Sequence, residues 1–153
     1  MIFLPAFLLG IIAGLRAMIA PAAVSWAAYF GLIDLSSTWL SFVGSIWTCL
    51  VLSIAVVAEL ISDQLPSTPK RTVPPQFGAR IFMGAASGAA LGAAHGGLAS
   101  GLIVGIVGAV VGTFVGLAAR SAMARGFGAD RPAAIIEDVV ALGGAALTVL
   151  LLA

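Results

Sequence analysis

The chain has 153 residues, of which 61% are hydrophobic and only 8% are charged, and its mean hydropathy is +1.19. Soluble proteins carry roughly 25% charged residues, so a soluble domain of this size is excluded and several elements must face hydrocarbon. The net charge of +1 gives no reason to expect a nucleic-acid partner. We therefore expect one transmembrane domain over residues 1–153, with the lipid bilayer as its main partner.

Few residues of this chain carry reactive chemistry. The one cysteine, Cys49, lies within an apolar run and cannot form an intrachain disulfide, and the one histidine, His95, cannot build a metal site without other ligands. The sequence contains no nucleophile elbow, no H-E-x-x-H pair and no phosphate-binding P-loop. We therefore expect no catalytic residue, no metal, no cofactor and no enzymatic activity.

Five apolar stretches follow one another along the chain, each near the roughly 20 residues that a helix needs to cross a bilayer. They predict an all-α, polytopic bundle of about five transmembrane helices. The predicted spans cover residues 2–31, 39–62, 78–97, 100–119 and 133–153.

The first apolar stretch contains both a charge and a helix breaker. No basic residue precedes Arg16 as a signal peptide would require, so we expect this helix to be retained. A charge at the depth of Arg16 costs at least ~2.5 kcal/mol on insertion scales and usually faces a protein interior or a water-filled cavity. Pro21 follows five residues later and removes an amide donor, which predicts a kink or a break.

Basic residues gather in or beside the loops on one side of the predicted bundle, whereas Asp34 is the only charged residue in the opposite loops. Since basic residues mark cytoplasmic loops, we expect the N-terminus in the cytoplasm and, after five spans, the C-terminus outside. The basic residues that support this orientation are Lys70, Arg71, Arg80, Arg120, Arg125 and Arg131.

Two acidic pairs lie near the same side as these basic residues. Glu59 and Asp63 are four residues apart and share one helix face, where they repel unless a cation or a proton intervenes. Glu137 and Asp138 lie about one turn into the last helix. The alternative interpretations are anchoring at the headgroup level and a structural ion pair. The predicted solute or ion site, or gate, comprises Arg16, Glu59, Asp63, Arg71, Thr72, Arg80, Glu137 and Asp138.

Glycines recur at helical spacing in the third and fourth stretches. This small-xxx-small pattern removes side-chain bulk from one stripe of each helix and allows close packing in lipid. We expect the two stripes to face each other in a glycine zipper, with a dimer interface or a pore wall as alternatives. The expected packing residues are Gly84, Gly88, Gly92, Gly96, Gly101, Gly105, Gly108, Gly112 and Gly116.

Three segments, "AGLRA", "ELISDQLPSTPKRTVPP" with the following "ARIFMGAASGAALG", and "AIIEDVVALG", together resemble a family of small bacterial integral membrane proteins catalogued as a domain of unknown function. The resemblance covers nearly the whole chain. It implies a protein of the bacterial cytoplasmic (inner) membrane and implies no activity. The motif positions that it singles out are Glu59, Asp63, Pro66, Thr68, Pro69, Arg71, Thr72, Arg80, Glu137 and Asp138.

Three functional classes are compatible with these features. The favoured hypothesis is a small transporter or channel whose charged cluster binds an ion or a polar solute. The alternative is a structural or accessory protein that assembles with a partner, or with a second copy, through its glycine-rich faces. An intramembrane enzyme acting on a lipid phosphate is the third class, and no recognised catalytic motif supports it.

Overall fold

The computed structural model describes residues 3–63 and 72–152, and within these ranges every regular element is helical. The prediction of an all-α fold is confirmed. The elements are α1 (Phe3–Leu15), α2 (Ile19–Tyr29), the 3-10 helix η1 (Ser41–Gly44), α3 (Ile46–Ser62), α4 (Pro74–Ala94), α5 (Leu98–Phe127) and α6 (Asp130–Leu150).

Local sequence explains where several helices begin and end. The Ser45 hydroxyl accepts a 3.2 Å hydrogen bond from the Thr48 amide and caps the start of α3. Pro74 opens α4, where a missing amide donor does no harm. Gly128 ends α5 with a φ of 68°, a left-handed conformation that glycine adopts without a steric penalty.

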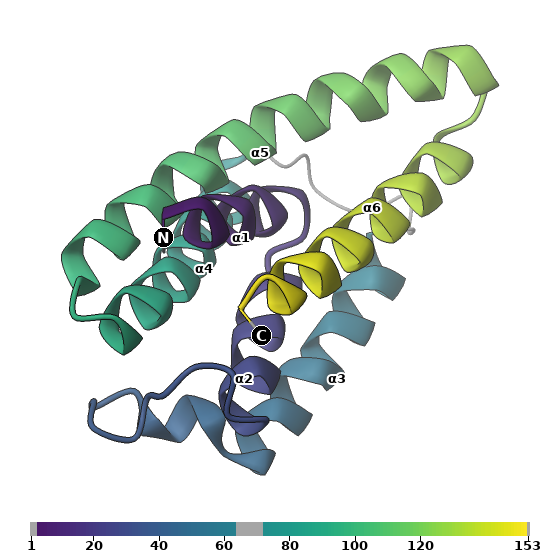
Figure 1. Ribbon diagram of the computed structural model, residues 1–153. Coiled ribbons are helices and arrows are strands. Elements are labelled where there is room, and N and C mark those ends of the chain that lie inside the picture. The colour runs from purple at the N-terminus through teal and green to yellow at the C-terminus, as the bar shows by residue number, and fades with distance from the viewer. Residues whose placement is uncertain (1–2, 64–71, 153) are drawn as a thin grey trace.

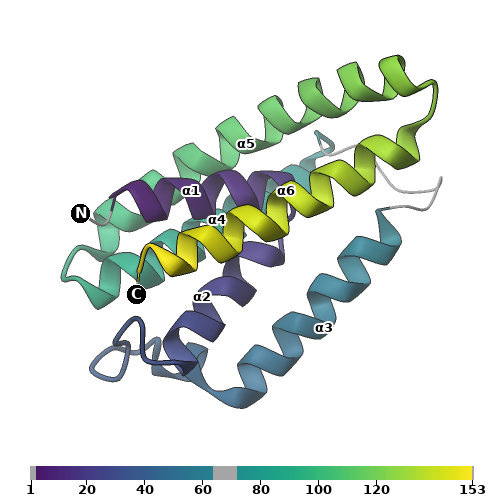
Figure 2. The same ribbon diagram turned by 45° about the vertical axis from the view of Figure 1, so that its right-hand side comes forward.

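Successive helices run back and forth along one direction, so the chain forms an antiparallel bundle (Figures 1 and 2). The N-terminus, the C-terminus and the turn between α4 and α5 lie at one end of the bundle. The turn between α1 and α2 and the turn between α5 and α6 lie toward the opposite end. We call the first the terminal end and the second the charged end.

The first apolar stretch, expected as one span over residues 2–31 with a kink or a break, is broken and forms two helices. The chain leaves helical geometry at residues 16–18, and α2 then returns toward the terminal end. Pro21 falls in the first turn of α2, so its missing amide donor removes no hydrogen bond within that helix. The described residues thus form six α-helices in place of the expected five, and both termini lie at one end of the bundle in place of opposite ends.

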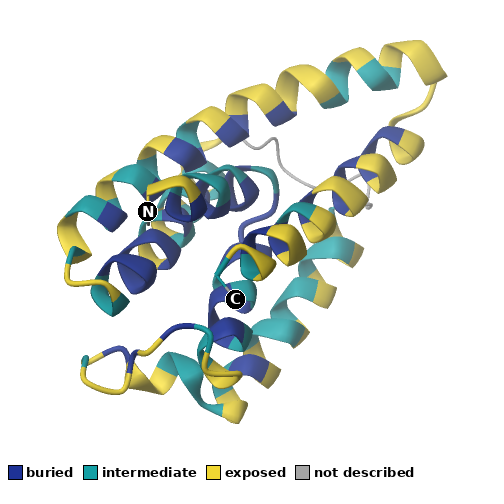
Figure 3. Cartoon of the chain, in the orientation of Figure 1, coloured by how far each residue is buried: buried dark blue, intermediate teal, exposed yellow. Residues whose placement is uncertain are grey.

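Two helices, α5 and α6, are long and apolar enough to cross a membrane. The helices α1 and α3 are apolar but shorter. The outward faces of α5 and α6 are largely exposed, whereas much of α1 and α4 is buried between their neighbours (Figure 3). Large apolar side chains such as Ile54, Phe82 and Val139 point away from the protein.

Glycines bring the backbones of α1, α4 and α5 into direct contact. A Cβ atom added at Gly88 would collide with the backbone of Gly101 on α5, and one added at Gly14 would collide with the backbone at Ala109 and Thr113. The glycines of α5 therefore divide between two partners, since Gly101 approaches α4 and Gly112 approaches α1. These three helices form the tightly packed part of the bundle.

Candidate functional site

The break between α1 and α2 exposes backbone groups that a continuous helix would pair internally. The last carbonyls of a helix and its first amides have no intrahelical partner, and in an apolar interior such groups must be satisfied by side chains. In this chain two charged side chains from other helices satisfy them, one at each side of the break.

Arg80 satisfies the carbonyl side of the break. Its Nη1 atom donates hydrogen bonds to the carbonyl oxygens of Gly14, at 2.9 Å, and Leu15, at 2.5 Å. The side chain is almost completely buried, near the start of α4. A guanidinium suits the C-terminal end of a helix because it complements the partial negative charge of the free carbonyls.

Glu59 satisfies the amide side of the break. Its Oε1 atom accepts from the Ala17 amide at 2.7 Å, and its Oε2 atom accepts from the Met18 amide at 2.9 Å. A carboxylate at this position also complements the partial positive charge at the N-terminus of α2. Glu59 and Arg80 therefore bond the backbone on the two sides of the break with charges that complement the two helix ends.

Arg16 lies within the break and has no exposed surface. Its guanidinium forms ion pairs with Asp63 at the end of α3 and with Asp138 on α6. Removing an arginine from water costs several kcal/mol unless opposite charges lie close to it. The three side chains, which we call the Arg16 triad, therefore tie the first helix break to two distant helices.

Arg80 also approaches the triad, with its Nη2 atom 3.9 Å from an Asp63 carboxylate oxygen. Glu137, next to Asp138 and similarly buried, lies 3.5 Å from an Nη atom of Arg120. Arg120 in turn binds Asp130 with a shortest distance of 2.6 Å. Buried and half-buried charges at α3, α4, α5 and α6 therefore form adjacent ion-pair networks around the helix break.

The structure brings together six of the eight residues expected at a site. Arg16, Glu59, Asp63, Arg80 and Asp138 surround the break, and Glu137 lies beside them. Thr72 is an exposed turn residue before α4. Arg71, with Pro66, Thr68 and Pro69, lies outside the described residues.

Gly96, one of the expected packing glycines, makes no close contact with another helix. It has a φ of 77° with nothing within 4 Å of an added Cβ, so it serves the turn between α4 and α5 and not helix packing. The close backbone contacts involve Gly84, Gly88, Gly92, Gly101, Gly105, Gly108 and Gly112. Gly116 is buried on α5.

Arg120 and Thr113 were not expected at the site. Arg120 lies eight residues before Gly128 and Glu137 lies eight residues after Ala129, so an antiparallel α5–α6 hairpin turning at these residues places the two side chains at one level. That symmetry is a sequence signal for the Arg120–Glu137 pair. The fully buried Thr113 hydroxyl donates to the Ala109 carbonyl at 2.8 Å and lies 3.3 Å from the Gly14 carbonyl, a contact that no sequence pattern predicts.

Two other polar residues lie away from this site. His95 bonds through Nδ1 to the Leu91 carbonyl at the terminal end. Asp34 is exposed in the loop after α2, where the hydroxyl and the amide of Ser36 donate to its carboxylate and lower its pKa. In the described part of the chain no group of three His, Cys, Asp or Glu side chains could hold a metal ion.

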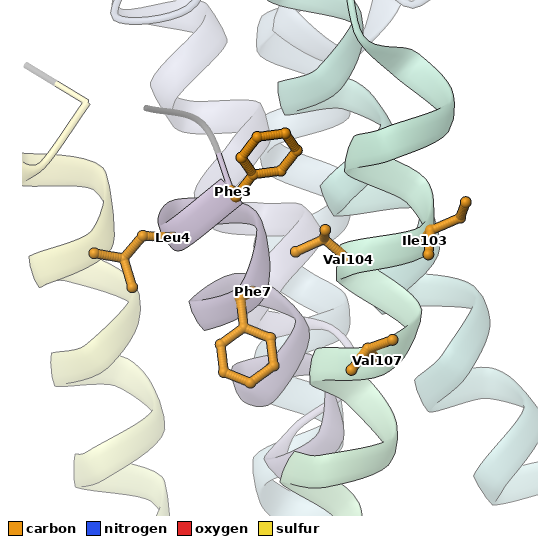
Figure 4. A pocket seen from close by; sticks show the side chains of 6 residues that line it. All are labelled: Phe3, Leu4, Phe7, Ile103, Val104 and Val107. Carbon is orange, nitrogen blue, oxygen red and sulfur yellow. The ribbon is translucent and has the colours of Figure 1, made fainter.

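The surface hollows differ sharply from the charged site. A shallow pocket of about 370 Å³ between α1 and α5 is lined by six apolar side chains, including Phe7 and Val107 (Figure 4). It offers no hydrogen-bonding side chain to a polar solute. The other hollows of the described residues likewise have no cluster of charged side chains, since Asp34 is the one charged residue that lines any of them.

Comparison with other proteins yields no match among curated proteins and none among solved structures. A family model does match, over residues 4–151, which is nearly the whole chain. The resemblance inferred from the sequence is thereby confirmed. The chain belongs to the family described as domain of unknown function DUF4126.

Proposed function

We propose that this chain is a multi-pass membrane protein that moves a small ion or polar solute across the bilayer, and that the helix break is its binding site or gate. Its large exposed apolar side chains, which occur on all six helices, support the membrane placement. Soluble monomers rarely expose continuous apolar surface on this scale.

The distribution of charge supports an orientation. Arg16, Arg80 and Arg120 lie toward the charged end, as does the start of α6, which carries Arg131. Basic residues favour the cytoplasmic side, so we place the charged end in the cytoplasm. Both termini then lie on the outer face of a bacterial cytoplasmic membrane.

The observation that carries the proposed function is the broken helix with a buried arginine on its carbonyl side and a half-buried glutamate on its amide side. Discontinuous helices at membrane depth are tolerated where they are buried in protein or line a cavity, and transporters use their free backbone ends to bind solutes. Ionisable groups in such positions are expensive and mark ion or solute pathways. Here Glu59 and Arg80 occupy the backbone groups of the break, which corresponds to a closed site.

The packing of the bundle supports a specific opening movement. The helix α5 contacts both α1 and α4 backbone to backbone, whereas α3 packs chiefly on α2 and η1. Two carboxylates hold α3 at the charged end. Glu59 accepts hydrogen bonds from the Ala17 and Met18 amides just before α2, and Asp63 forms an ion pair with Arg16. Release of these two carboxylates would free the α2–α3 pair to move against the packed helices.

The test is flux through liposomes that contain the purified protein, with Na⁺, K⁺, chloride and tetramethylammonium as probes. Saturable flux of one probe is expected, and Glu59→Gln should reduce it at least about tenfold. The Gln side chain has one acceptor oxygen in place of the two carboxylate oxygens that accept from the Ala17 and Met18 backbone amides. Asp34→Asn is the matched control, since Asp34 is an exposed acid that bonds only to Ser36 among the described contacts.

One observation favours a structural or accessory role instead. Glu59 and Arg80 have partners inside the protein at the break, as a permanent clamp would require. Wild-type liposomes without flux of any probe, together with a lower unfolding temperature for Glu59→Gln, would support the clamp and contradict transport.

A further inference from the structure

The turn between α5 and α6 is the outermost part of the charged end (Figures 1 and 2). All residues from 125 to 132 are exposed, as the colouring of this turn in Figure 3 shows. A Cβ atom added at Gly126 or at Gly128 would find nothing within 4 Å, so no other described element covers the turn. We call residues 125–131 the α5–α6 tip.

The length of α5 determines where this tip lies in a bilayer. Its 30 residues rise by about 45 Å, whereas the hydrocarbon core is about 30 Å thick and the bilayer with its headgroups about 40–45 Å. Residues 98–119 contain no charged side chain, and Arg120 and Arg125 follow them. A helix that crosses the core over roughly its first 20 residues therefore carries the tip into the headgroup layer.

The described charges at this end are equal in number but unequally placed. Each acid there bonds to a backbone amide or to one of the arginines Arg16 and Arg120. These acids are Glu59, Asp63, Asp130, Glu137 and Asp138.

Two arginines at the tip are left without such an acid. Arg125 and Arg131 stand three residues before and three residues after Gly128, and neither forms an ion pair with a described residue. Two exposed positive charges therefore flank the turn, and a phosphate is the group that guanidinium side chains bind most readily. The tip thus presents a surface complementary to an anion.

An aromatic side chain at the tip narrows the choice of anion. Phe127, between two glycines, has 55% of its surface exposed. Surfaces that combine basic and aromatic side chains lie at the boundary between lipid headgroups and acyl chains. A phospholipid offers the arginines a phosphate and offers the ring an apolar neighbour, whereas a soluble inorganic anion offers only the first.

We propose that the α5–α6 tip binds the headgroup of an anionic phospholipid, with Arg125 and Arg131 at its phosphate and Phe127 at the start of its acyl chains. This inference rests on the membrane placement proposed above and not on transport. A zwitterionic phospholipid also has a phosphate, but its own ammonium group compensates that charge, so the tip should prefer anionic lipids.

A fluorophore at the tip reports which lipid binds there. Ala129→Cys in a Cys49→Ala background carries a single cysteine in the turn and is labelled with bimane. The labelled protein is placed in phosphatidylcholine nanodiscs that contain a small fraction of phosphatidylglycerol or phosphatidylcholine with a nitroxide near the glycerol as quencher. The relative affinity should be at least about tenfold higher for phosphatidylglycerol, since each arginine near an anionic surface favours it by about fivefold. In about 1 M NaCl this preference should fall, because exposed charges are screened.

The matched control is the other end of the same helix. Leu98→Cys, in the same background, places the label at the exposed start of α5, where residues 81–119 contain no Asp, Glu, Lys or Arg, and no lipid preference is expected. At the tip, Arg125→Gln/Arg131→Gln should remove the preference and Arg125→Lys/Arg131→Lys should keep most of it. Phe127→Ser should weaken binding of both lipids alike.

Equal quenching by the two lipids at the tip, the same preference at both labelled positions, or a preference that survives Arg125→Gln/Arg131→Gln would overturn the proposal. Both arginines are exposed and outside the described ion pairs, so these variants should unfold at the wild-type temperature. A lipid preference without flux in liposomes would contradict transport and retain the lipid site, whereas flux without the preference would do the opposite. Quenching by neither lipid at either position would contradict the membrane placement itself and the lipid site with it.

Discussion

Single charged residues determine the local geometry of this protein at its first helix break. Arg80 completes the end of α1 and Glu59 completes the start of α2, so two side chains of opposite charge replace the hydrogen bonds that a continuous helix would contain. Both act from helices distant in sequence. The conformation at residues 16–18 is therefore a tertiary feature, although Pro21 makes the sequence compatible with it.

Arg80→Met should lower the free energy of unfolding by about 3–5 kcal/mol, the range for breaking a buried charge network by removal of one partner. The substitution leaves the Gly14 and Leu15 carbonyls without this donor and removes a positive group 3.9 Å from Asp63. Reversible unfolding in mixed micelles would measure the change. Arg125→Met is the control, because Arg125 lies near the end of α5, away from the break, and a loss of equal size there would contradict the role of Arg80.

At the scale of elements, the helices use two kinds of contact. The backbones of α1, α4 and α5 touch at glycines, which gives van der Waals contact where lipid supplies no hydrophobic drive. By contrast α3 buries only Cys49 completely and leaves hollows on both sides, toward α6 and toward α4. Among the described helices, α3 is thus packed less closely than α1, α4 and α5.

Gly88→Ala should destabilise the protein by about 1–3 kcal/mol, the usual effect of overpacking, because the added Cβ would meet the backbone of α5 and not a movable side chain. Gly143→Ala is the matched control on α6, since nothing lies within 4 Å of its added Cβ. The unfolding temperature of both variants in the same micelles measures the difference. Equal temperatures would show that α4 and α5 do not approach as closely as described.

At the scale of the whole molecule, the even number of α-helices among the described residues brings both termini to one end. The charged residues of the site gather toward the opposite end, and the orientation proposed above rests on this separation. The split of the first apolar stretch into α1 and α2 is what places the N-terminus at the same end of the bundle as the C-terminus.

Cysteines introduced one at a time into a Cys49→Ala background test this arrangement. Cysteines at Phe3 and at Leu152 should both react with a membrane-impermeant reagent added to the outside of intact cells. A cysteine at Ala129, in the turn between α5 and α6, should react only after the cells are opened. Labelling of Leu152→Cys but not of Phe3→Cys from outside would restore a continuous first helix and contradict the six-helix topology.

The sequence by itself determined the helical class, the approximate ranges of the later helices and six of the residues that gather at the site. It could do so because apolar run length predicts helices and because a charge within such a run requires a partner. Only the tertiary structure decided that Arg16 pairs with Asp63 and Asp138, that Glu59 and Arg80 divide the two sides of the break, and that the glycines of α5 serve two neighbours. These contacts join residues far apart in the chain, and local propensity carries no information about which distant helix will supply the partner.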